Sequence, residues 1–244
     1  MSGRVGPLPP SFNNTYSLAF DGVDDYVDCG DVSTLSNATT FTYSGWYKQS
    51  TLDVIAYMFG SYIDVSNRVF IYTWSNGLLN FQIEKSGTNY YARFDYSTAV
   101  TAGQWFHLAV VYDGSGATNA DKVKIYIDGV LMTLSFIGAF PTSTPLGTNL
   151  TTIGKVDDAA QTWNGSIDEV ALFSTTKTGL EIADIYNSGV PNDLSAISGL
   201  TNWYRNGDPD GQASYPTITD VGSGSNDGTM TNMIAADIET NVPT

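Results

Sequence analysis

The amino-acid sequence predicts an all-β protein, a sandwich of two antiparallel sheets with one short helix. Short runs in which apolar and polar residues alternate recur along most of the chain, and turn-forming pairs such as Asn76-Gly77 separate them. Residues 123–131 form two such runs joined by Asp128-Gly129, a pair that favours the positive φ angles of a tight hairpin. Residues 179–186 have the apolar spacing of a helix.

The predicted strands are short and closely spaced, as is typical of antiparallel sheets. They cover residues 16–20, 26–29, 41–48, 55–62, 68–74, 78–84, 90–96, 104–112, 123–131, 151–154 and 165–173. The segment 104–112 is apolar on both faces, which predicts a central strand that is covered on both sides. We expect the helix at 179–186, with Leu180 and Ile185 on its apolar side, to cap one end of the sandwich.

The composition divides the chain into three parts. Residues 1–15 are rich in Gly and Pro, which predicts an extended N-terminal arm that a neighbouring subunit holds in place. Residues 16–190 contain the predicted strands and form the sandwich domain. Residues 191–244 have too few apolar residues for a core of their own, so we expect an extension that packs on the same domain or on a neighbour.

Charge and cysteine content exclude several classes of protein. A net charge of −15 with only 10 Lys and Arg leaves no basic patch for nucleic acid. No apolar run approaches the roughly 20 residues that cross a membrane, and the first ten residues lack the apolar centre of a signal peptide. Cys29 is the only cysteine and His107 the only histidine. We expect both to be packed strand residues rather than a nucleophile and a base.

Six segments occur in the order that is characteristic of a known family. They are residues 17–27, 41–46, 103–109, 112–114, 125–129 and 165–170. Together they resemble the laminin-G-like, concanavalin A-like lectin/glucanase family. The resemblance implies a jelly-roll sandwich, and it does not imply a ligand, because one fold hosts many functions.

The C-terminal part also resembles a piece of that family. Residues 203–208 and 224–230 are similar to the segment that normally precedes the first strand, yet here they follow the last one. Either the domain is permuted, so that the tail pairs beside the first strand, or the tail supplies a strand to a neighbour. Similar chains with such a tail occur among proteins of marine bacteriophages.

The acidic residues do not form a hydrolytic motif. Glucanases of the resembled fold have a strand in which two Glu flank an Asp at alternate positions, which places all three carboxylates on one face. None of the four Glu here lies within four residues of another. Asp24-Asp25 and Asp157-Asp158 are adjacent pairs in turns, so we expect their side chains to point apart. The sequence therefore predicts a protein that is not an enzyme.

A structural calcium ion is what the resemblance implies as a cofactor. Family members often hold one near the first Phe-Asp-Gly turn and the final Ile-Asp-Glu strand, and Asp21 and Asp168 occupy these positions here. The backbone carbonyl of Gly22 would be a third oxygen ligand, in keeping with the preference of calcium for oxygen. The alternative is that Asp21 only forms the turn and Asp168 only accepts a backbone hydrogen bond.

Aromatic residues suggest a binding platform. The rings of Tyr and Trp stack on sugars, and a candidate set lies in the predicted strands: Trp46, Tyr72, Trp74, Tyr90 and Tyr91. The same residues are also common in cores and protein interfaces.

The sequence leaves two candidate functions. The first is a non-enzymatic structural virion protein of a bacteriophage, a capsid-decoration, tail or fibre subunit that forms a homo-oligomer and binds other virion subunits. It is favoured by a lectin-like module that has no signal peptide and by a tail suited to strand exchange or to pairing back on its own domain. The alternative is a carbohydrate-binding adhesion module that recognises host surface glycans.

Overall fold

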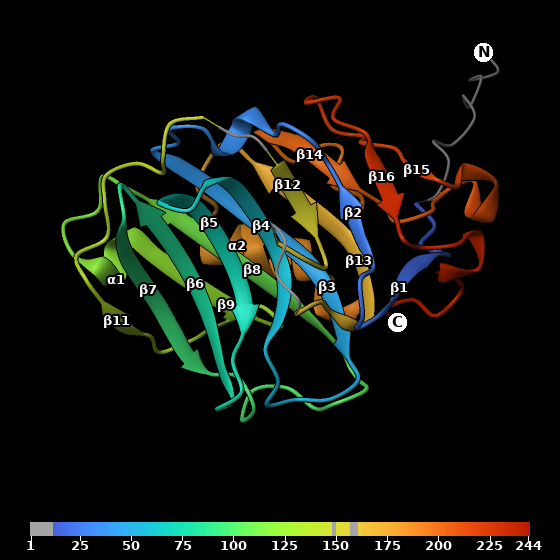
Figure 1. Ribbon diagram of the computed structural model, residues 1–244, viewed down its shortest axis with the longest axis horizontal. Helices are drawn as coiled ribbons and strands as arrows, with labels where there is room; N and C mark the ends of the chain where they lie inside the picture. Colours follow the sequence, from blue (N-terminus) through green and yellow to red (C-terminus); the bar gives the residue numbers. More distant parts are fainter. Residues whose placement is uncertain (1–11, 148–149, 157–160) are drawn as a thin grey trace, which may run out of the picture.

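The computed structural model describes residues 12–147, 150–156 and 161–244, and it confirms the two-sheet antiparallel sandwich (Figure 1). The eight-stranded sheet contains, in order, β10 (Val130–Leu131), β9 (Val123–Ile127), β8 (Trp105–Asp113), β3 (Thr40–Gln49), β13 (Asn164–Phe173), β1 (Ser17–Asp21) and β17 (Ile238–Glu239), with β14 (Leu200–Tyr204) also paired to β13. The nine-stranded sheet contains, in order, β11 (Ser135–Ile137), β7 (Thr88–Asp95), β6 (Leu78–Lys85), β5 (Asn67–Thr73), β4 (Ala56–Asp64), β12 (Leu150–Ile153), β2 (Tyr26–Asp28), β16 (Gly228–Thr231) and β15 (Thr217–Ile218).

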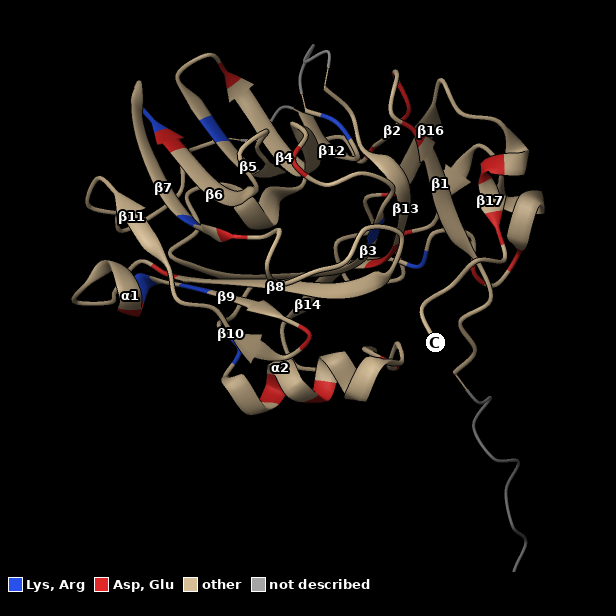
Figure 2. Cartoon of the chain, turned by 90° about the horizontal axis from the view of Figure 1, so that it is seen from below, with Lys and Arg blue, Asp and Glu red and all other residues tan. Residues whose placement is uncertain are grey.

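A single apolar core fills the space between the two sheets, which Figure 2 shows as stacked layers. Alternation along β6 turns Leu79, Phe81 and Ile83 inward, and all three are completely buried. The ring of Phe41 in β3 lies 6.0 Å from that of Phe81 and so joins one sheet to the other. Burial of these large side chains stabilises the domain without any disulfide bond, since its only cysteine is free.

The hairpin at the centre of the sequence forms as predicted. Asp128 and Gly129 have φ angles of 49° and 74°, the left-handed values that a two-residue turn between β9 and β10 requires. Strand β8 pairs with β3 on one side and β9 on the other, so the doubly apolar segment is a central strand.

Helix α2 (Gly179–Tyr186) has the predicted length but not the predicted place. It covers the outer face of the eight-stranded sheet, where Ile182 and Ile185 pack with Ala109 of β8 and Ala171 of β13 (Figure 2). The expectation that it caps an end of the sandwich was wrong, because these small side chains leave room for a helix on the face of the sheet. Leu180, expected on the apolar side, is 81 % exposed. A second, shorter helix, α1 (Asn119–Lys122), precedes β9.

The C-terminal extension pairs with its own domain. Tyr204 in β14 lies opposite Val170 in β13, Met230 in β16 lies opposite Val27, and Ile238 in β17 lies opposite Leu18. The extension therefore lies beside the first two strands, as the permuted alternative requires.

The arm is described only from Phe12 onward, and the Asp157-Asp158 pair also lies outside the described residues. Phe12 stacks on Trp203 of the extension with ring centroids 6.1 Å apart, and the Arg205 guanidinium lies 4.5 Å from the Phe12 ring centre. The described end of the arm thus packs against its own chain. Among the described residues, no helix combines the length and apolar character needed to cross a membrane.

Candidate functional site

The outer face of the nine-stranded sheet presents polar and aromatic side chains in rows. Tyr72 of β5, Asn80 of β6 and Arg93 of β7 lie directly opposite one another. Cross-strand neighbours on one face are close enough for their side chains to act on a common ligand. This row continues to Tyr57 of β4 and to Ser135 of β11.

A hollow of about 280 Å³ lies over this row. Its lining residues are Tyr72, Trp74, Asn76, Leu78, Asn80, Tyr91, Arg93 and Ile137. The Trp74 side chain is 42 % exposed, whereas Tyr72 is 6 % exposed and meets Trp74 edge to face at 6.0 Å. The hollow thus combines an accessible aromatic face with a few polar groups, the composition that is typical of small-ligand sites.

Polar side chains farther along the same strands are already paired. Arg68 forms an ion pair with Glu84, and Gln82 Nε2 donates a hydrogen bond of 2.6 Å to Asn89 Oδ1. Among the described residues, the side chains of Asn80 and Arg93 form no hydrogen bond or ion pair with the protein. Their donors and acceptors are therefore available to a ligand.

Burial raises the pKa of the Tyr72 hydroxyl. Burial also raises the pKa of the Tyr91 hydroxyl, and the negative charge of Glu84 adds to this shift. Both phenols keep their protons at neutral pH. The hydroxyl of each can then donate a hydrogen bond to a ligand.

The structure brings together three of the five aromatic residues that the sequence suggested, Tyr72, Trp74 and Tyr91. Trp46 belongs to the other sheet, is 3 % exposed, and stacks against Tyr186 of α2 at 5.7 Å. Tyr90 faces the opposite side of β7 from Tyr91, because neighbouring strand residues alternate, and its ring lies 6.2 Å from the core residue Phe140. Trp46 and Tyr90 therefore cannot stack on a ligand in the hollow.

Asn80 and Arg93 were missed by the sequence analysis, although a signal for both was present. Leu79, Phe81 and Ile83 mark the inner face of β6, so the residues between them must point outward. The same alternation in β7 places Arg93 between the buried Ala92 and Phe94.

The predicted metal ligands do not meet at one point. Asp21 pairs with Asn164, at the start of β13, whereas Asp168 lies four residues further along that strand. Four residues of a strand span about 13 Å, so one calcium ion cannot contact both carboxylates. Gly22 lies in the Asp21 turn, with a φ of 78°.

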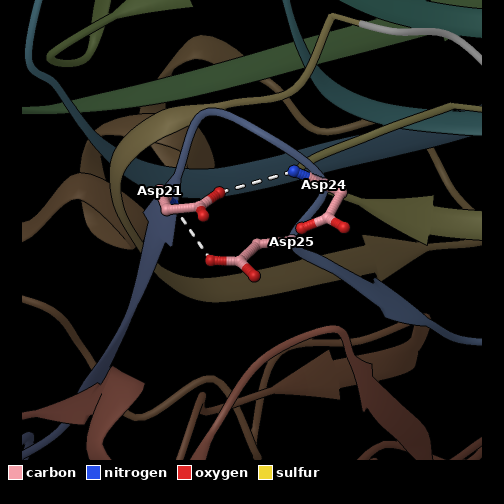
Figure 3. Close-up of side chains that lie close together, drawn as sticks. All are labelled: Asp21, Asp24 and Asp25. Carbon is pink, nitrogen blue, oxygen red and sulfur yellow. Dashed lines mark hydrogen bonds between the residues drawn. The ribbon is translucent and has the colours of Figure 1, made fainter.

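Three carboxylates converge at the Asp21 turn (Figure 3). Oxygen atoms of Asp21, Asp24 and Asp25 all lie within 4.8 Å of one another. Asp21 Oδ1 accepts a hydrogen bond from the Val23 amide at 2.7 Å, and Asp25 Oδ2 accepts one from the Asp21 amide at 3.0 Å. The expectation that Asp24 and Asp25 point apart was wrong, because the turn folds both back toward Asp21.

Asp25 is the buried member of this set, with 4 % exposure. Burial, together with the neighbouring carboxylates of Asp21, Asp237 and Asp24, raises the pKa of Asp25 to about 6. A hard divalent cation would relieve this repulsion, and carboxylate oxygens are its preferred ligands. The residues of the turn therefore fit the expected calcium ion in charge and in donor type.

Asp168 belongs to a different acidic group inside the protein. It is completely buried, and Asn14 Nδ2 donates a hydrogen bond of 2.8 Å to its Oδ2. Glu169 is also buried and pairs with Arg205, which lies 3.7 Å from Asp208. Burial and the Glu169 charge raise the pKa of Asp168.

Two side-chain oxygen atoms near this interior group lack a hydrogen-bond partner in the described structure. The Oδ1 atoms of Asn14 and Asn206 are buried with no hydrogen-bond partner in the described structure. Asn206 Nδ2 bonds to the carbonyl of Ile167, the residue before Asp168. The group offers a second place that suits a hard cation.

Comparison of the sequence with family models identifies the family. Residues 21–183, about two thirds of the chain, match the model described as the concanavalin A-like lectin/glucanases superfamily. The chain belongs to this superfamily. No curated protein sequence matches this lectin-like chain.

Solved structures of the same fold agree with that assignment. The match to a native heptameric pentraxin from Limulus polyphemus covers 90 % of this lectin-like chain and 97 % of the pentraxin chain, with 15 % identity and a TM-score of 0.52. A candidate carbohydrate-binding protein from Bacteroides ovatus covers 95 % of the chain with 18 % identity and a TM-score of 0.62, and the match spans 62 % of that protein. The carbohydrate-binding module of a Ruminococcus gnavus sialidase, bound to α2,3-sialyllactose, covers 70 % of the chain and 96 % of its own, with 15 % identity and a TM-score of 0.56. At these identities the likeness establishes the fold.

Proposed function

We propose that this lectin-like domain binds carbohydrate in the hollow on the outer face of the nine-stranded sheet. The observation that carries the proposal is the combination, in one hollow, of the exposed Trp74 ring with the unpaired side chains of Asn80 and Arg93. A sugar presents an apolar ring face and a rim of hydroxyl groups. The first suits an aromatic ring, and the second suits fixed polar groups.

The comparisons support this proposal over a purely structural role. The Ruminococcus gnavus module was solved with sialyllactose, and the Bacteroides ovatus protein is named for carbohydrate binding. The adhesion-module alternative in the sequence analysis therefore has more support than the virion hypothesis, which none of these comparisons favours.

Substitution of Trp74 tests the proposal. Trp74→Ala removes the accessible ring from the rim of the hollow and leaves the core intact, because the ring is 42 % exposed. We expect it to weaken glycan binding by roughly tenfold or more, measured by calorimetry, with little change in melting temperature. Leu180→Ala is the matched control, since Leu180 is an exposed apolar residue on α2. Equal affinities of the wild type and Trp74→Ala for every bound glycan would refute the proposed site.

We propose further that binding is not coupled to hydrolysis. Glycoside hydrolysis needs two carboxyl groups on either side of the bond. Glu84, the only acid of β6, is held by Arg68, and no carboxylate of the described residues lines the hollow. Release of reducing ends from a bound oligosaccharide would contradict this.

Calcium is proposed as a structural cofactor at the Asp21 turn, with Asp21, Asp24 and Asp25 as its carboxylate ligands. The charge of the ion would offset the repulsion among three acids that lie within 4.8 Å. This set replaces the one predicted from the resemblance, in which Asp168 was a ligand. The interior group around Asp168 is the alternative place if the turn does not bind the ion.

The virion location and the homo-oligomer stay hypotheses that are separate from glycan binding. The extension pairs with β13, β2 and β1 of its own domain, so it gives no support to strand exchange with a neighbouring subunit. Light scattering on the purified chain would give the oligomeric state directly.

A further inference from the structure

Arg93 differs from the other basic residues in the described part of the chain. Its guanidinium makes no hydrogen bond, ion pair or cation–π contact there. The charged ends of the other described lysines and arginines each have such a partner. Arg68, which lies on the same face, is neutralised by Glu84. Arg93 is thus the positive charge on this face that is left for a ligand.

The lining of the hollow around Arg93 is also free of acidic side chains. The chain contains 25 Asp and Glu, yet none of those in the described part of the chain lines the hollow. Asp95 lies two residues after Arg93 at the end of β7, opposite Leu78, but it is not among the lining residues, and its Oδ1 accepts a hydrogen bond of 2.9 Å from Ser97 Oγ. In a protein with a net charge of −15, a site with one arginine and no carboxylate favours a negatively charged ligand locally.

Cross-strand rows of side chains place Arg93 beside the aromatic residues of the hollow. Tyr72 and Arg93 lie on either side of Asn80 in one cross-strand row, and Tyr91 lies two residues before Arg93 on the same face. A sugar ring that stacks on Trp74 would therefore bring its substituents over Asn80 and Arg93. The planar guanidinium can form two parallel hydrogen bonds with a carboxylate or a sulfate.

We propose that the glycan bound in this hollow carries an anionic group, a carboxylate or a sulfate, that pairs with Arg93. This inference rests on the proposed carbohydrate-binding function. Asn80 hydrogen-bonds the neutral part of the same sugar, and the aromatic rings hold its apolar face. Uronic acids, sialic acids and sulfated sugars share this chemistry.

A glycan array with matched pairs tests the inference. The pairs are oligogalacturonates with their methyl esters, sialyllactose with lactose, and sulfated with unsulfated lactosamine. We expect the full chain to retain the acidic member of at least one pair at least tenfold more tightly than its neutral partner. The pair that responds shows whether the anion is a carboxylate or a sulfate.

Variants then assign the preference to Arg93. We expect Arg93→Gln to lose the tenfold preference, Arg93→Lys to keep part of it, and Lys124→Gln to keep all of it. Lys124→Gln is the matched control because it removes one positive charge from β9, in the other sheet. Raising the salt concentration from 50 to 500 mM should weaken the acidic glycan only, because salt screens charge pairs at partly exposed sites.

The outcomes separate the two proposals. If neutral and acidic partners bind equally well and Trp74→Ala abolishes both, the domain binds glycans and the inference about Arg93 is wrong. If the preference survives in Arg93→Gln, the anion pairs elsewhere and the inference is again wrong. An array on which no glycan is retained overturns the proposed function together with the inference.

Discussion

His107 should make the domain less stable as the pH falls from 7 to 5. Its ring is completely buried between Trp46 and Tyr186, with centroid distances of 5.2 and 5.9 Å. Nε2 lies 2.8 Å from Ser44 Oγ, and Nδ1 has no partner in the described structure. Asp128 lies near but uses its Oδ1 to accept the His107 backbone amide at 2.8 Å. Burial therefore lowers the pKa of His107 from 6.5 to about 3.

The sign and size of the effect follow from proton linkage. The unfolded chain binds a proton at His107 below about pH 6.5, whereas the folded protein does so only near pH 3, so acid favours unfolding between these values. At pH 5 the solution is about 1.5 units below the pKa of His107 in the unfolded chain, and each unit corresponds to about 1.4 kcal/mol. The free energy of unfolding is therefore lower by about 2 kcal/mol. For a domain of this size that corresponds to a melting temperature lower by roughly 4–8 °C. The result is insensitive to the folded pKa as long as that value is well below 5.

Comparison with His107→Gln isolates this contribution. Raised carboxyl pKa values, such as that of Asp25, act in the opposite direction, since those groups favour the folded state at low pH. They are the same in both proteins, so their effect cancels in the difference. Melting followed by circular dichroism at pH 7 and pH 5 should show a drop that is roughly 4–8 °C larger in the wild type. An equal drop in both proteins would show that His107 is accessible or already charged, contrary to the structure.

Two further predictions concern the calcium ion and the extension. Calcium at a hundred times its dissociation constant should stabilise the chain by about 2.7 kcal/mol, a rise in melting temperature of roughly 5–10 °C over a chelator-treated sample. Asp24→Asn should abolish the rise, whereas the control Asp193→Asn should leave it unchanged. If Asp24→Asn still binds calcium as the wild type does, the ion is not bound at the Asp21 turn, and the interior group around Asp168 becomes the candidate site. Deletion of residues 192–244 should abolish cooperative melting, because it leaves β1 and β2 as unpaired sheet edges and removes Trp203, which packs with Ala171 and Ile182. Deletion of residues 1–11 should not. A cooperative transition in the C-terminally truncated chain would contradict the structure.

Local patterns predicted most of the fold. The alternation that buries Leu79, Phe81 and Ile83 is present in the sequence as a simple period of two, and the Asp128-Gly129 turn has one favoured geometry. The place of α2 could not be predicted in the same way. Its docking depends on small residues such as Ala109 and Ala171, which come together only when β8 and β13 flank β3.

The candidate site was only partly predictable for a related reason. Adjacent aromatic residues such as Tyr90 and Tyr91 look alike in composition, and only the direction of the strand relative to the core separates them. Arg93 is a candidate because Asn80 and Ser135 lie opposite it, so that no acidic side chain faces it in the described sheet, and strand register decides this. Asp21 and Asp168 are separated by the register of β1 on β13, and no local pattern contains that information.

A crystal structure of the chain with the glycan that binds best on the array would locate the bound sugar. We expect the sugar in the hollow over β5, β6 and β7, with its ring stacked on Trp74 and its hydrogen bonds to Asn80 and Arg93. Density for the sugar on the other sheet, or at the Asp21 turn alone, would contradict it.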